Sequence, residues 1–590
     1  IKQASRLLHI DEKVFPAKLI SSLISSAKNE MIGPADYPTI ASSPAQEVTA
    51  KIYPQYESIL RSSKALDFDD LINKTVSLFK TKPEVLSKWQ TQFKYIMIDE
   101  YQDTNTAQYQ FVNLLVGKQD NIAVVGDDSQ GIYSWRGADF RNILKFETDY
   151  PNCQVIKLEQ NYRSTGNILK AANSLITKNL QRTDKNLWTL AGEGLPVQAV
   201  HVQNERIESE SIVRRIRLGL DANHRKLQDH AVLYRTNAQS RTIEEALIHH
   251  AIPYRVIGGV KFYDRKEIKD VLAYLRLIYQ PEDKISFDRI VNVPTRGIGA
   301  KSLLNFKSWQ EHNKLNLEDA LNSVKECNNL TDKARQSLDT LGDTLNNLRK
   351  ISPTVSVYTL IDTLLKRIDY VHYLDDGSVQ GEARVENVKE MLSVAEEYSQ
   401  SDLATFLEEV SLISDTDTSQ GSSGDAVTLM TIHSAKGLEF PIVFIPGFEE
   451  SLLPHSRALY DQTDMEEERR LAYVGMTRAK EELYLIYASS RLLYGGVQHN
   501  PPSRFLAESE VVEETGIIEQ GEAVSDFQLS PDYSVDEPMY VPDLSEGDSV
   551  HHQIFGRGTV TKVDGDNVEI LFKNKGLRKI NLSFAPLEKI

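Results

Sequence analysis

The stretch Tyr95–Asn105 reads YIMIDEYQDTN. An apolar run, residues 95–98, is followed directly by Asp99 and Glu100, with Asp103 three residues further on. Short apolar runs with polar ends are typical of buried strands in a parallel sheet. Carboxylates at the end of such a strand are costly unless a cation uses them, and that cation is usually a metal on the phosphates of a nucleotide. The stretch therefore predicts an α/β fold with a nucleotide site, and a phosphate-binding loop should accompany it.

Further apolar runs occur along the chain, separated by helix-like segments, as is typical of a parallel α/β sheet. They are IAVVGD (122–127), CQVIKLE (153–159), AVLYR (231–235), VTLMTIH (427–433), PIVFIPG (441–447) and ELYLIYAS (482–489). Residues 1–63 and 263–413 instead carry apolar side chains at three- and four-residue steps, which predicts helices. We therefore expect an α/β protein into which a helical domain is inserted.

The composition is that of an ordinary globular protein with several domains, with 590 residues, 41% hydrophobic and 26% charged. The formal net charge of −17 argues by itself against a nucleic-acid partner. However, the stretch 508–548 holds 13 Asp and Glu residues and no Lys or Arg, so most of the negative charge belongs to it. We interpret this stretch as a linker, and the rest of the chain stays compatible with nucleic acid.

The sequence also limits the compartment and the kind of site. No run approaches the 18 apolar residues of a membrane span, and the first residues do not resemble a signal peptide, so we expect a soluble, cytoplasmic protein. Cys153 and Cys327 lie far apart and in no metal-type spacing, which argues against a disulfide or zinc framework.

After the acidic linker, residues 548–590 alternate apolar and polar side chains, with turns at Asp564-Gly565 and Lys575-Gly576. This pattern predicts a small β-barrel or β-sandwich. The segment holds seven basic and five acidic residues and is therefore mildly basic. We expect a small module that a long tether connects to the rest of the chain.

Residues with a chemistry of their own follow the run IAVVGD. Gln130 stands where it could sense a terminal phosphate, and Tyr133, Trp135 and Arg136 come close behind. Two aromatic side chains and an arginine within four residues suit stacking on nucleic-acid bases, at about 1–3 kcal/mol per base, with a cation on the backbone. The alternative is that Trp135 is a core residue.

Two arginines occupy similar positions in later segments. Arg163 follows a strand in QNYRSTGNIL (160–169), and Arg478 lies on the predicted helix EEERRLAYVGMTRAK (466–480). Isolated arginines are usually surface charges. A phosphoryl-transfer site, however, uses one or two fixed guanidinium groups, each worth roughly 10³–10⁵ in rate.

Five segments, in this order, resemble the motor motifs of superfamily-one DNA helicases of the UvrD, Rep and PcrA type. They are DEYQDTN (99–105), SWRGAD (134–139), QNYRSTGNIL, HSAKGLEF (433–440) and RRLAYVGMTRA (469–479). Their combination is highly specific, and the resemblance covers nearly the whole chain. Spacing and composition alone indicate only a protein that uses a nucleotide and stacks on bases.

The resemblance implies two RecA-like parallel-sheet domains, each with an inserted helical domain, and a small Tudor-like β-barrel at the end. The implied ranges are 1–63 for the first insertion, 64–157 for the first core domain, 158–262 and 427–507 for the second core domain, 263–426 for the second, duplex-binding insertion, 508–547 for the linker and 548–590 for the barrel.

The resemblance also implies a site for ATP and Mg²⁺. Its members would be Asp99 on the metal, Glu100 on the attacking water, Gln130 between the γ-phosphate and the DNA groove, Arg163 and Arg478 on the γ-phosphate, Tyr162 on the adenine and Glu439 on the ribose.

Single-stranded DNA and its junctions with duplex are the implied partners. Base pockets and strand contacts would be formed by Phe68, Tyr133, Trp135, Arg136, His433, His455 and Tyr494. In VPTRGIGAKSL (293–303), a hairpin with Gly297, Gly299 and Lys301 would grip the duplex backbone without reading its sequence.

The C-terminal module resembles one that is implicated in docking on RNA polymerase in PcrA-like helicases. The alternative is a weak DNA-holding patch made by Lys573, Lys575, Arg578 and Lys579.

The phosphate-binding motif GxxxxGK[ST] does not occur in the sequence. The nearest segment, GIGAKS (297–302), lacks a glycine before its lysine and follows no apolar strand. In the family this loop precedes the first insertion, so we expect it upstream of Ile1. Without the amides and the lysine of that loop, these 590 residues alone are expected not to hydrolyse ATP.

The leading hypothesis is an ATP-driven 3′→5′ DNA helicase or translocase of bacterial DNA repair or replication, associated with the nucleoid. The alternative is a non-catalytic DNA-binding or interaction protein that lacks the loop. The helicase half of a helicase–nuclease is disfavoured, because no nuclease-like segment follows Phe505.

Overall fold

The computed structural model of the chain describes residues 1–11, 14–117, 120–223, 225–416, 424–493, 496–511, 545, 547–552, 556–564, 567–572, 576–581 and 587–589. The chain divides into two compact units. The larger unit comprises residues 1–459 and 463–521, and the smaller comprises 460–462 and 522–590.

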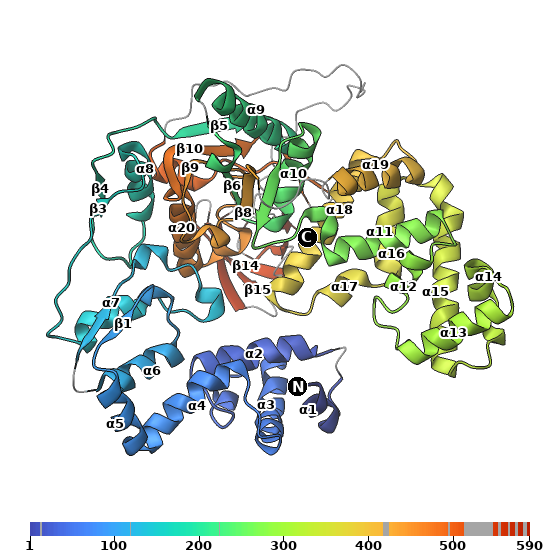
Figure 1. The fold of residues 1–590 in the computed structure, drawn as a ribbon, viewed down its shortest axis with the longest axis horizontal. Helices are drawn as coiled ribbons and strands as arrows, with labels where there is room; N and C mark the ends of the chain where they lie inside the picture. The colour runs from blue at the N-terminus through green and yellow to red at the C-terminus, as the bar shows by residue number, and fades with distance from the viewer. Residues whose placement is uncertain are drawn as a thin grey trace. The chain divides into compact units, whose positions relative to one another are not determined.

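A six-stranded sheet, in which every neighbouring pair of strands is parallel, lies at the centre of the larger unit. Its strands are β5 (Gln198–Val202), β6 (His230–Tyr234), β7 (Tyr254–Ile257), β8 (Val427–Thr431), β9 (Phe440–Ile445) and β10 (Ala479–Ala488). The order is β5-β10-β9-β6-β8-β7, so strands from before and after the helical insertion interleave (Figure 1). The predicted α/β fold with a parallel sheet is confirmed.

Both faces of this sheet are buried, which explains why its strands read as near-continuous apolar runs. In β6, Ala231 and Leu233 face one hydrophobic core, whereas Val232 and Tyr234 face the other. Helices complete the two cores: α8 (Gly166–Ile176) and α20 (Gln462–Met476) on the first face, α9 (Glu205–Asn223) and α10 (Ser240–His249) on the second. The sheet is therefore the middle layer of three.

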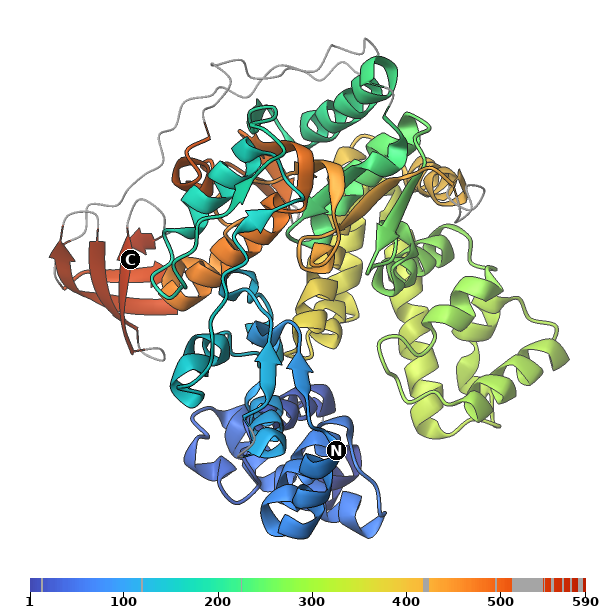
Figure 2. The same cartoon turned by 60° about the vertical axis from the view of Figure 1, so that its left-hand side comes forward.

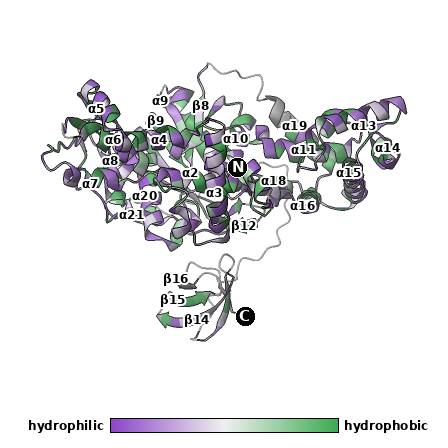
Figure 3. Cartoon of the chain, turned by 90° about the horizontal axis from the view of Figure 1, so that it is seen from below, coloured by the Kyte–Doolittle hydropathy of each residue, from purple (hydrophilic) through white to green (hydrophobic). Residues whose placement is uncertain are grey.

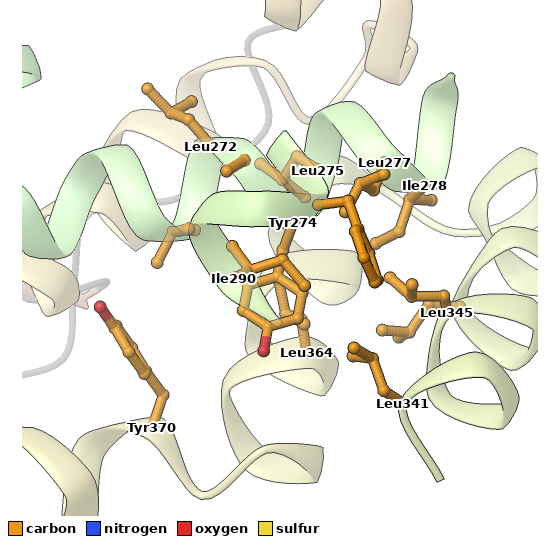
Figure 4. Close-up of a cluster of buried hydrophobic side chains, with 14 of the residues drawn as sticks. Leu272, Tyr274, Leu275, Leu277, Ile278, Ile290, Leu341, Leu345, Leu364 and Tyr370 are labelled. Carbon is orange, nitrogen blue, oxygen red and sulfur yellow. The ribbon is translucent and has the colours of Figure 1, made fainter. Parts of the chain in front are cut away.

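A helical segment leaves the sheet after β7 and returns to it at β8. Its helices are α11 (Lys266–Tyr279), α12 (Lys284–Ile290), α13 (Ala300–His312), α14 (Leu317–Asn322), α15 (Asp332–Ile351), α16 (Val357–Arg367), α17 (Tyr370–Leu374), α18 (Val379–Glu397) and α19 (Leu403–Thr416). They share one hydrophobic core, where Leu341 and Leu345 point toward Ile278 and Leu364 (Figure 4). The insertion therefore packs around a centre of its own.

Helices also dominate the first 150 residues. They are α1 (Lys2–Leu7), α2 (Ala17–Asn29), α3 (Pro44–Ser62), α4 (Phe68–Thr81), α5 (Pro83–Gln92), α6 (Thr106–Val116) and α7 (Arg141–Asp149). The stretch Tyr95–Asn105 forms β1 (Ile96–Ile98), a 3₁₀ turn over Tyr101–Asp103 and the start of α6. Asn105 is the N-cap of α6. Its side chain accepts a hydrogen bond from the backbone amide of Gln108, and the Gln108 side chain accepts one from the backbone amide of Asn105, which forms a capping box.

The strands of this part form small sheets. β1 pairs in parallel with β2 (Ile122–Val124), and Figure 2 shows the two side by side. The prediction of a strand over residues 153–159 is wrong, since only β3 (Gln160–Asn161) follows and pairs with β4 (Trp188–Thr189). The reason is that no described strand pairs with this run, and its apolar side chains Val155, Ile156 and Leu158 are more than half exposed.

The larger unit ends with a short hairpin and a helix. The hairpin consists of β11 (Arg491–Leu493) and β12 (Gly496–Gln498), which are antiparallel, and the helix is α21 (Arg504–Glu508).

The smaller unit is an antiparallel sheet. Its strands are β13 (Ser549–His552), β14 (Gly556–Asp564), β15 (Asn567–Phe572), β16 (Gly576–Asn581) and β17 (Leu587–Lys589), in the order β16-β15-β14-β13-β17. Val550, Val560, Val568, Ile570 and Phe572 form its core. The predicted all-β character is confirmed, whereas closure into a barrel stays a prediction.

Hydropathy follows this packing. Most helices of the larger unit carry hydrophilic and hydrophobic residues along the same ribbon, as expected for amphipathic helices at a core (Figure 3). Among the described residues, no helix combines the length and the apolar character that a membrane span requires.

Leu345→Ala should lower the free energy of unfolding of the helical insertion by about 2–5 kcal/mol, because it leaves a cavity in the core that Figure 4 shows. Urea unfolding followed by tryptophan fluorescence measures the effect, since Trp309 packs against this core. Leu304→Ala is the matched control, because Leu304 is 66% exposed and its loss should change the free energy by less than about 0.5 kcal/mol. Equal effects of the two changes would contradict the assigned core.

Candidate functional site

Two carboxylates stand at the carboxyl end of β1, where the sequence predicts a metal ligand and a water-activating group. Asp99 and Glu100 are exposed, and Asp99 accepts a hydrogen bond of 2.9 Å from the Glu100 amide. Glu100 has a left-handed backbone, with φ 51° and ψ 42°, which is uncommon for a residue other than glycine. The side-chain amide of the fully buried Gln102 donates to the Glu100 carboxylate. The turn thus holds both acids in defined directions.

A lysine from HSAKGLEF reaches these acids from the six-stranded sheet. Lys436 Nζ lies 2.6 Å from Asp103 Oδ2 and 3.3 Å from Glu100 Oε2, and it donates to the Gln130 carbonyl at 2.9 Å. The lysine side chain is only 8% exposed, so these interactions act with little screening by water. Burial raises the pKa of Asp103, and Lys436 opposes that rise. The third acid of YIMIDEYQDTN is therefore paired with a lysine.

Gln130 lies in a 3₁₀ turn, Asp128–Gln130, that follows β2. Its side-chain amide donates to Asp127 Oδ2 at 2.8 Å, and the Asp127 amide donates to Gln102 Oε1 at 2.9 Å. A Cβ on Gly126 would lie 2.4 Å from that same oxygen, so glycine permits the close approach. Gln102 thus joins the loops that follow β1 and β2.

Arg163 and Glu439, predicted on the γ-phosphate and the ribose, contact each other. Arg163 Nε lies 2.8 Å from Glu439 Oε2, and Lys480 Nζ lies 2.7 Å from Glu439 Oε1. Hydrogen bonds from Lys480 and Arg163 lower the pKa of Glu439 to about 2. Because Glu439 is 44% exposed, these pairs contribute little to stability and can be exchanged for other partners.

Arg478 is buried, with a relative exposure of 1%. Its guanidinium donates to the carbonyls of Val474 (3.0 Å) and Leu438 (3.3 Å) and to the Thr477 hydroxyl (3.2 Å), and it forms no ion pair with any described residue. Burial and the nearby charge of Arg163 lower its pKa to about 10. A buried guanidinium with only neutral acceptors favours an incoming anion.

The aromatic segment forms a 3₁₀ turn over Ser134–Arg136. The Arg136 guanidinium lies 4.5 Å from the Trp135 ring centroid and 5.6 Å from that of Tyr133. The Tyr133 hydroxyl donates to the His433 carbonyl, and Lys436 Nζ lies 5.4 Å from the Tyr133 ring centroid. Trp135 is 46% exposed, so the alternative of a core tryptophan is wrong.

Two of the predicted DNA-contacting histidines lie beside a charged pair. Burial and the charge of Arg235 lower the pKa values of His433 and His455 to about 4, so both imidazoles are neutral at pH 7. Glu468 accepts from the His455 amide at 3.0 Å and pairs with Arg235 at 2.6 Å. The His433 ring stands edge-on to Trp135, with centroids 6.5 Å apart.

Helix α20 connects the aromatic turn with the buried arginine. Glu467 accepts hydrogen bonds from the amide (3.2 Å) and the hydroxyl of Ser134. Arg470 donates to the Gly131 carbonyl at 3.0 Å and stacks on Phe140. α20 ends at Met476, and β10 begins at Ala479, so the prediction that Arg478 lies on this helix is wrong. Because Arg478 lies only two residues beyond α20, a displacement of the helix would move both places together.

The remaining predicted residues lie apart from these contacts. Tyr162 is 82% exposed and donates to Gln160, and Phe68, 91% exposed, begins α4. Gly297 has φ +74°, Gly299 is the N-cap of α13, and Lys301 is exposed. Tyr494 and the basic residues Lys573 and Lys575 lie outside the described residues.

Several residues of the site were not predicted. They are Gln102, Lys185, Arg235, Lys436, Glu467, Glu468 and Arg470, of which Lys185 pairs with Asp127 and Asp128. Most of them lie inside the motifs quoted above, so membership of a motif was the sequence signal that could have identified them as site residues. Apart from the contact of Gln102 with the nearby Glu100, their roles depend on partners 13 to 339 residues away in sequence, which no local pattern shows.

Comparison with protein families gives three matches. The UvrD/REP helicase N-terminal domain matches residues 1–151, and the UvrD-like helicase C-terminal domain matches residues 156–490. The PcrA/UvrD tudor domain matches residues 547–589.

Individual relatives align over the full chain. The protein named ATP-dependent DNA helicase PcrA of Bacillus subtilis (strain 168) is 43% identical over 615 residues, which cover 100% of this chain and 83% of the relative. The proteins of the same name from Leuconostoc citreum and from Staphylococcus aureus (strain NCTC 8325 / PS 47) are each 41% identical, with the same shares covered.

Trp135→Ala should weaken binding of single-stranded DNA by about 1–3 kcal/mol, the contribution of one stacked base, and leave thermal stability unchanged because the ring is half exposed. Fluorescence anisotropy with a labelled oligonucleotide and a thermal melt measure the two quantities. Trp188→Ala is the matched control, since Trp188 is 48% exposed and lies on β4. A lower melting temperature with unchanged affinity would contradict the stacking role.

Proposed function

Since the chain belongs to the UvrD/PcrA-like helicase family, we propose that it is the motor of an ATP-dependent DNA helicase that moves 3′→5′ on single-stranded DNA. Its substrates are ATP and DNA with a single-stranded region next to a duplex. The observation that carries the proposal is the contact of Lys436, from the segment between β8 and β9, with Glu100 and Asp103, which follow β1, and with Gln130, which follows β2.

Hydrolysis of ATP uses a carboxylate that follows β1 and two arginines that lie near the six-stranded sheet. Glu100, held by Gln102 in its left-handed turn, orients the attacking water and takes its proton. Arg478 and Arg163 stabilise the negative charge that develops on the transferred phosphoryl group. Arg163 can turn toward a phosphate because its present partner, Glu439, is half exposed and weakly held.

Asp99 fits the single protein ligand that Mg²⁺ needs when the ion rides on nucleotide phosphates. Its carboxylate is exposed, and one oxygen contacts only the neighbouring amide of Glu100. The ion would supply charge neutralisation on the phosphates. Asp103 does not fit this role, because Lys436 already occupies its carboxylate.

Tyr162 and Glu439 bind the rest of the nucleotide in this proposal. The Tyr162 ring is 82% exposed, which leaves its face open for the adenine. Glu439 presents a carboxylate with a pKa of about 2, ionised at neutral pH and able to accept hydrogen bonds from ribose hydroxyls.

Single-stranded DNA lies along the aromatic turn. Tyr133, Trp135 and the neutral His433 offer faces and edges for bases, and Arg136 faces the phosphate backbone. Phe68, His455 and Tyr494 contact further nucleotides in this proposal. The loop with Gly297 and Gly299, together with Lys301 at the start of α13, binds the duplex backbone, so the predicted hairpin is replaced by a loop and a helix N-terminus. These assignments rest on the resemblance of the motifs and on exposure where the residues are described.

Coupling between ATP and DNA runs through Gln130, Lys436 and α20. The Gln130 side chain donates to Asp127, in the loop after β2. The Gln130 backbone carbonyl accepts from Lys436, which also lies over the Tyr133 ring. A change in phosphate occupancy at Arg478 is passed along α20 to Ser134 through Glu467. The Trp135 turn therefore responds to the state of the nucleotide.

Glu100→Gln should abolish ATP hydrolysis but leave the affinity for single-stranded DNA unchanged within twofold, because Lys436 keeps its closer contacts with Asp103 and the Gln130 carbonyl when Glu100 is neutral. The measurement uses an extended chain in which the phosphate-loop segment of a relative is joined ahead of Ile1, with phosphate release and anisotropy recorded on one preparation. Glu47→Gln, a change on α3, is the control and should leave both quantities unchanged.

A non-catalytic DNA-binding protein would show equal, negligible hydrolysis in the extended wild-type chain and the Glu100→Gln variant. That result would contradict the helicase proposal and support the alternative. A loss of DNA affinity as large as the loss of rate would contradict the assignment of Glu100.

The C-terminal sheet docks on a protein partner, and RNA polymerase is the partner that the resemblance favours. Deletion from Glu522 onward removes residues of the smaller unit only, and it keeps the Arg469–Glu508 pair that holds α21. The truncated chain should bind single-stranded DNA normally and lose capture of purified RNA polymerase in a pull-down. Lower DNA affinity with a shallower salt dependence and unchanged capture would instead make the module a DNA grip.

A further inference from the structure

Two histidines and a glutamate meet at the surface of the larger unit, away from the contacts described above. Glu210 lies on α9, His249 is the last residue of α10, and His250 is its C-cap. His250 Nε2 lies 2.6 Å from Glu210 Oε2, and the two imidazole rings stand edge to face with centroids 4.9 Å apart. One nitrogen or oxygen atom of each of the three side chains lies within 4.8 Å of those of the other two.

The two helices that carry these side chains are held together by the sheet. α9 and α10 lie on the same face of it, with Ile212 and Ile216 of α9 and Leu247 of α10 in one hydrophobic core (Figure 1). The packed helices therefore fix the distance between Glu210 and the histidine pair before any ligand binds. Such preorganisation lowers the entropic cost of closing a site.

We propose that Glu210, His249 and His250 form a binding site for a transition-metal dication of the Zn²⁺ class. Imidazole and carboxylate ligands suit Zn²⁺, Co²⁺, Ni²⁺ and Cu²⁺, whereas Mg²⁺ and Ca²⁺ prefer oxygen ligands. Two histidines and one carboxylate are a frequent ligand set for tetrahedral Zn²⁺ with an open fourth position. Because Glu210 and His249 are exposed, water can fill that position.

The geometry of the three groups is close to what such an ion requires. Zn²⁺ binds nitrogen and oxygen at about 2.0–2.2 Å, so ligand atoms of a tetrahedral site lie roughly 3.3 Å apart. To hold the ion, the Glu210 and His250 atoms, now 2.6 Å apart, would separate by a fraction of an ångström, and the His249 atom would approach from within 4.8 Å.

The local field includes charges of both signs. Arg214, Arg217 and Asp221 line the hollow beside Glu210 and His250. The Arg217 guanidinium donates to the His250 carbonyl at 3.3 Å, so it is directed at the backbone. The carboxyl end of α10 adds the negative end of a helix dipole, which attracts a cation.

The competing interpretation is a simple hydrogen bond between Glu210 and His250 that joins α9 to α10. It explains the 2.6 Å contact but gives no role to the ring of His249. A metal would engage all three side chains. It would also clamp one end of α10, whose other end holds the helical insertion through Arg241 and Glu390 of α18 at 2.8 Å.

Isothermal titration of the untagged, chelator-treated chain with ZnCl₂, and of a parallel sample with CoCl₂ under visible spectroscopy, tests the site. We expect one equivalent to bind, tetrahedral Co²⁺ bands to appear, and Zn²⁺ to raise the melting temperature. His249→Ala and Glu210→Gln should each weaken binding at least tenfold. His312→Ala is the control, since His312 is also an exposed histidine in the last turn of a helix, α13, and its loss should change nothing.

Circular dichroism of each metal-free variant checks that it is folded, and Glu210→Gln keeps the shape of the side chain if His249→Ala is unstable. Binding that is absent, or equal in the wild type and all three variants, would overturn the proposal. Loss of binding with Glu210→Gln but not with His249→Ala would also overturn it, because the ion would then bind elsewhere. Neither DNA nor ATP enters the assay, so its outcome is independent of the helicase proposal.

Discussion

The buried ammonium group of Lys436 joins the two halves of the candidate site. It neutralises Asp103 and Glu100 at the end of β1 and holds the carbonyl of Gln130, although it belongs to the segment between β8 and β9. Burial and the charge of Glu100 both raise the pKa of Asp103, and Lys436 opposes that rise. The lysine therefore allows acids to be concentrated beside a nucleotide site without opening the turn that carries them.

The other contacts of the site extend from this point. Gln102 ties the loop after β1 to the loop after β2, and α20 ties the aromatic turn to Arg478. These interactions join turns that are anchored on strands β1 and β2 and on helix α20. Events at the phosphates can therefore be passed to the strand-binding residues as small displacements of whole elements. This is the physical basis on which a DNA motor is the favoured function.

Much of this could be predicted from the sequence. Apolar runs such as AVLYR and PIVFIPG predicted strands correctly because both faces of a parallel sheet are buried, and that burial makes the runs continuous. CQVIKLE has the same local pattern but is exposed and forms no strand, since strand formation requires neighbours that a local pattern does not reveal. The exposure of single residues could not be predicted from the sequence either. Only the structure shows that Trp135 is half exposed and is not a core residue.

Contacts between distant segments were the least predictable part. The motif HSAKGLEF identified the region of Lys436, but its partners Glu100 and Asp103 lie more than 300 residues earlier in the chain. Similarly, Glu210 and His250 carry no motif, and only the packing of α9 on α10 brings them together. Periodicity reports which face of an element is buried, and it contains no information on which element buries it.

We infer that the ammonium group of Lys436 links the acids of the proposed nucleotide site to the aromatic turn that we propose binds DNA. A double-mutant cycle on the affinity for single-stranded DNA, with Lys436→Gln, Asp103→Asn and both changes together, tests it most directly. We expect Lys436→Gln to weaken binding about tenfold, because unpaired acids displace the turn, and we expect a much smaller loss when Asp103 is already neutral. An affinity unchanged by Lys436→Gln, or effects of the two changes that simply add, would contradict this inference.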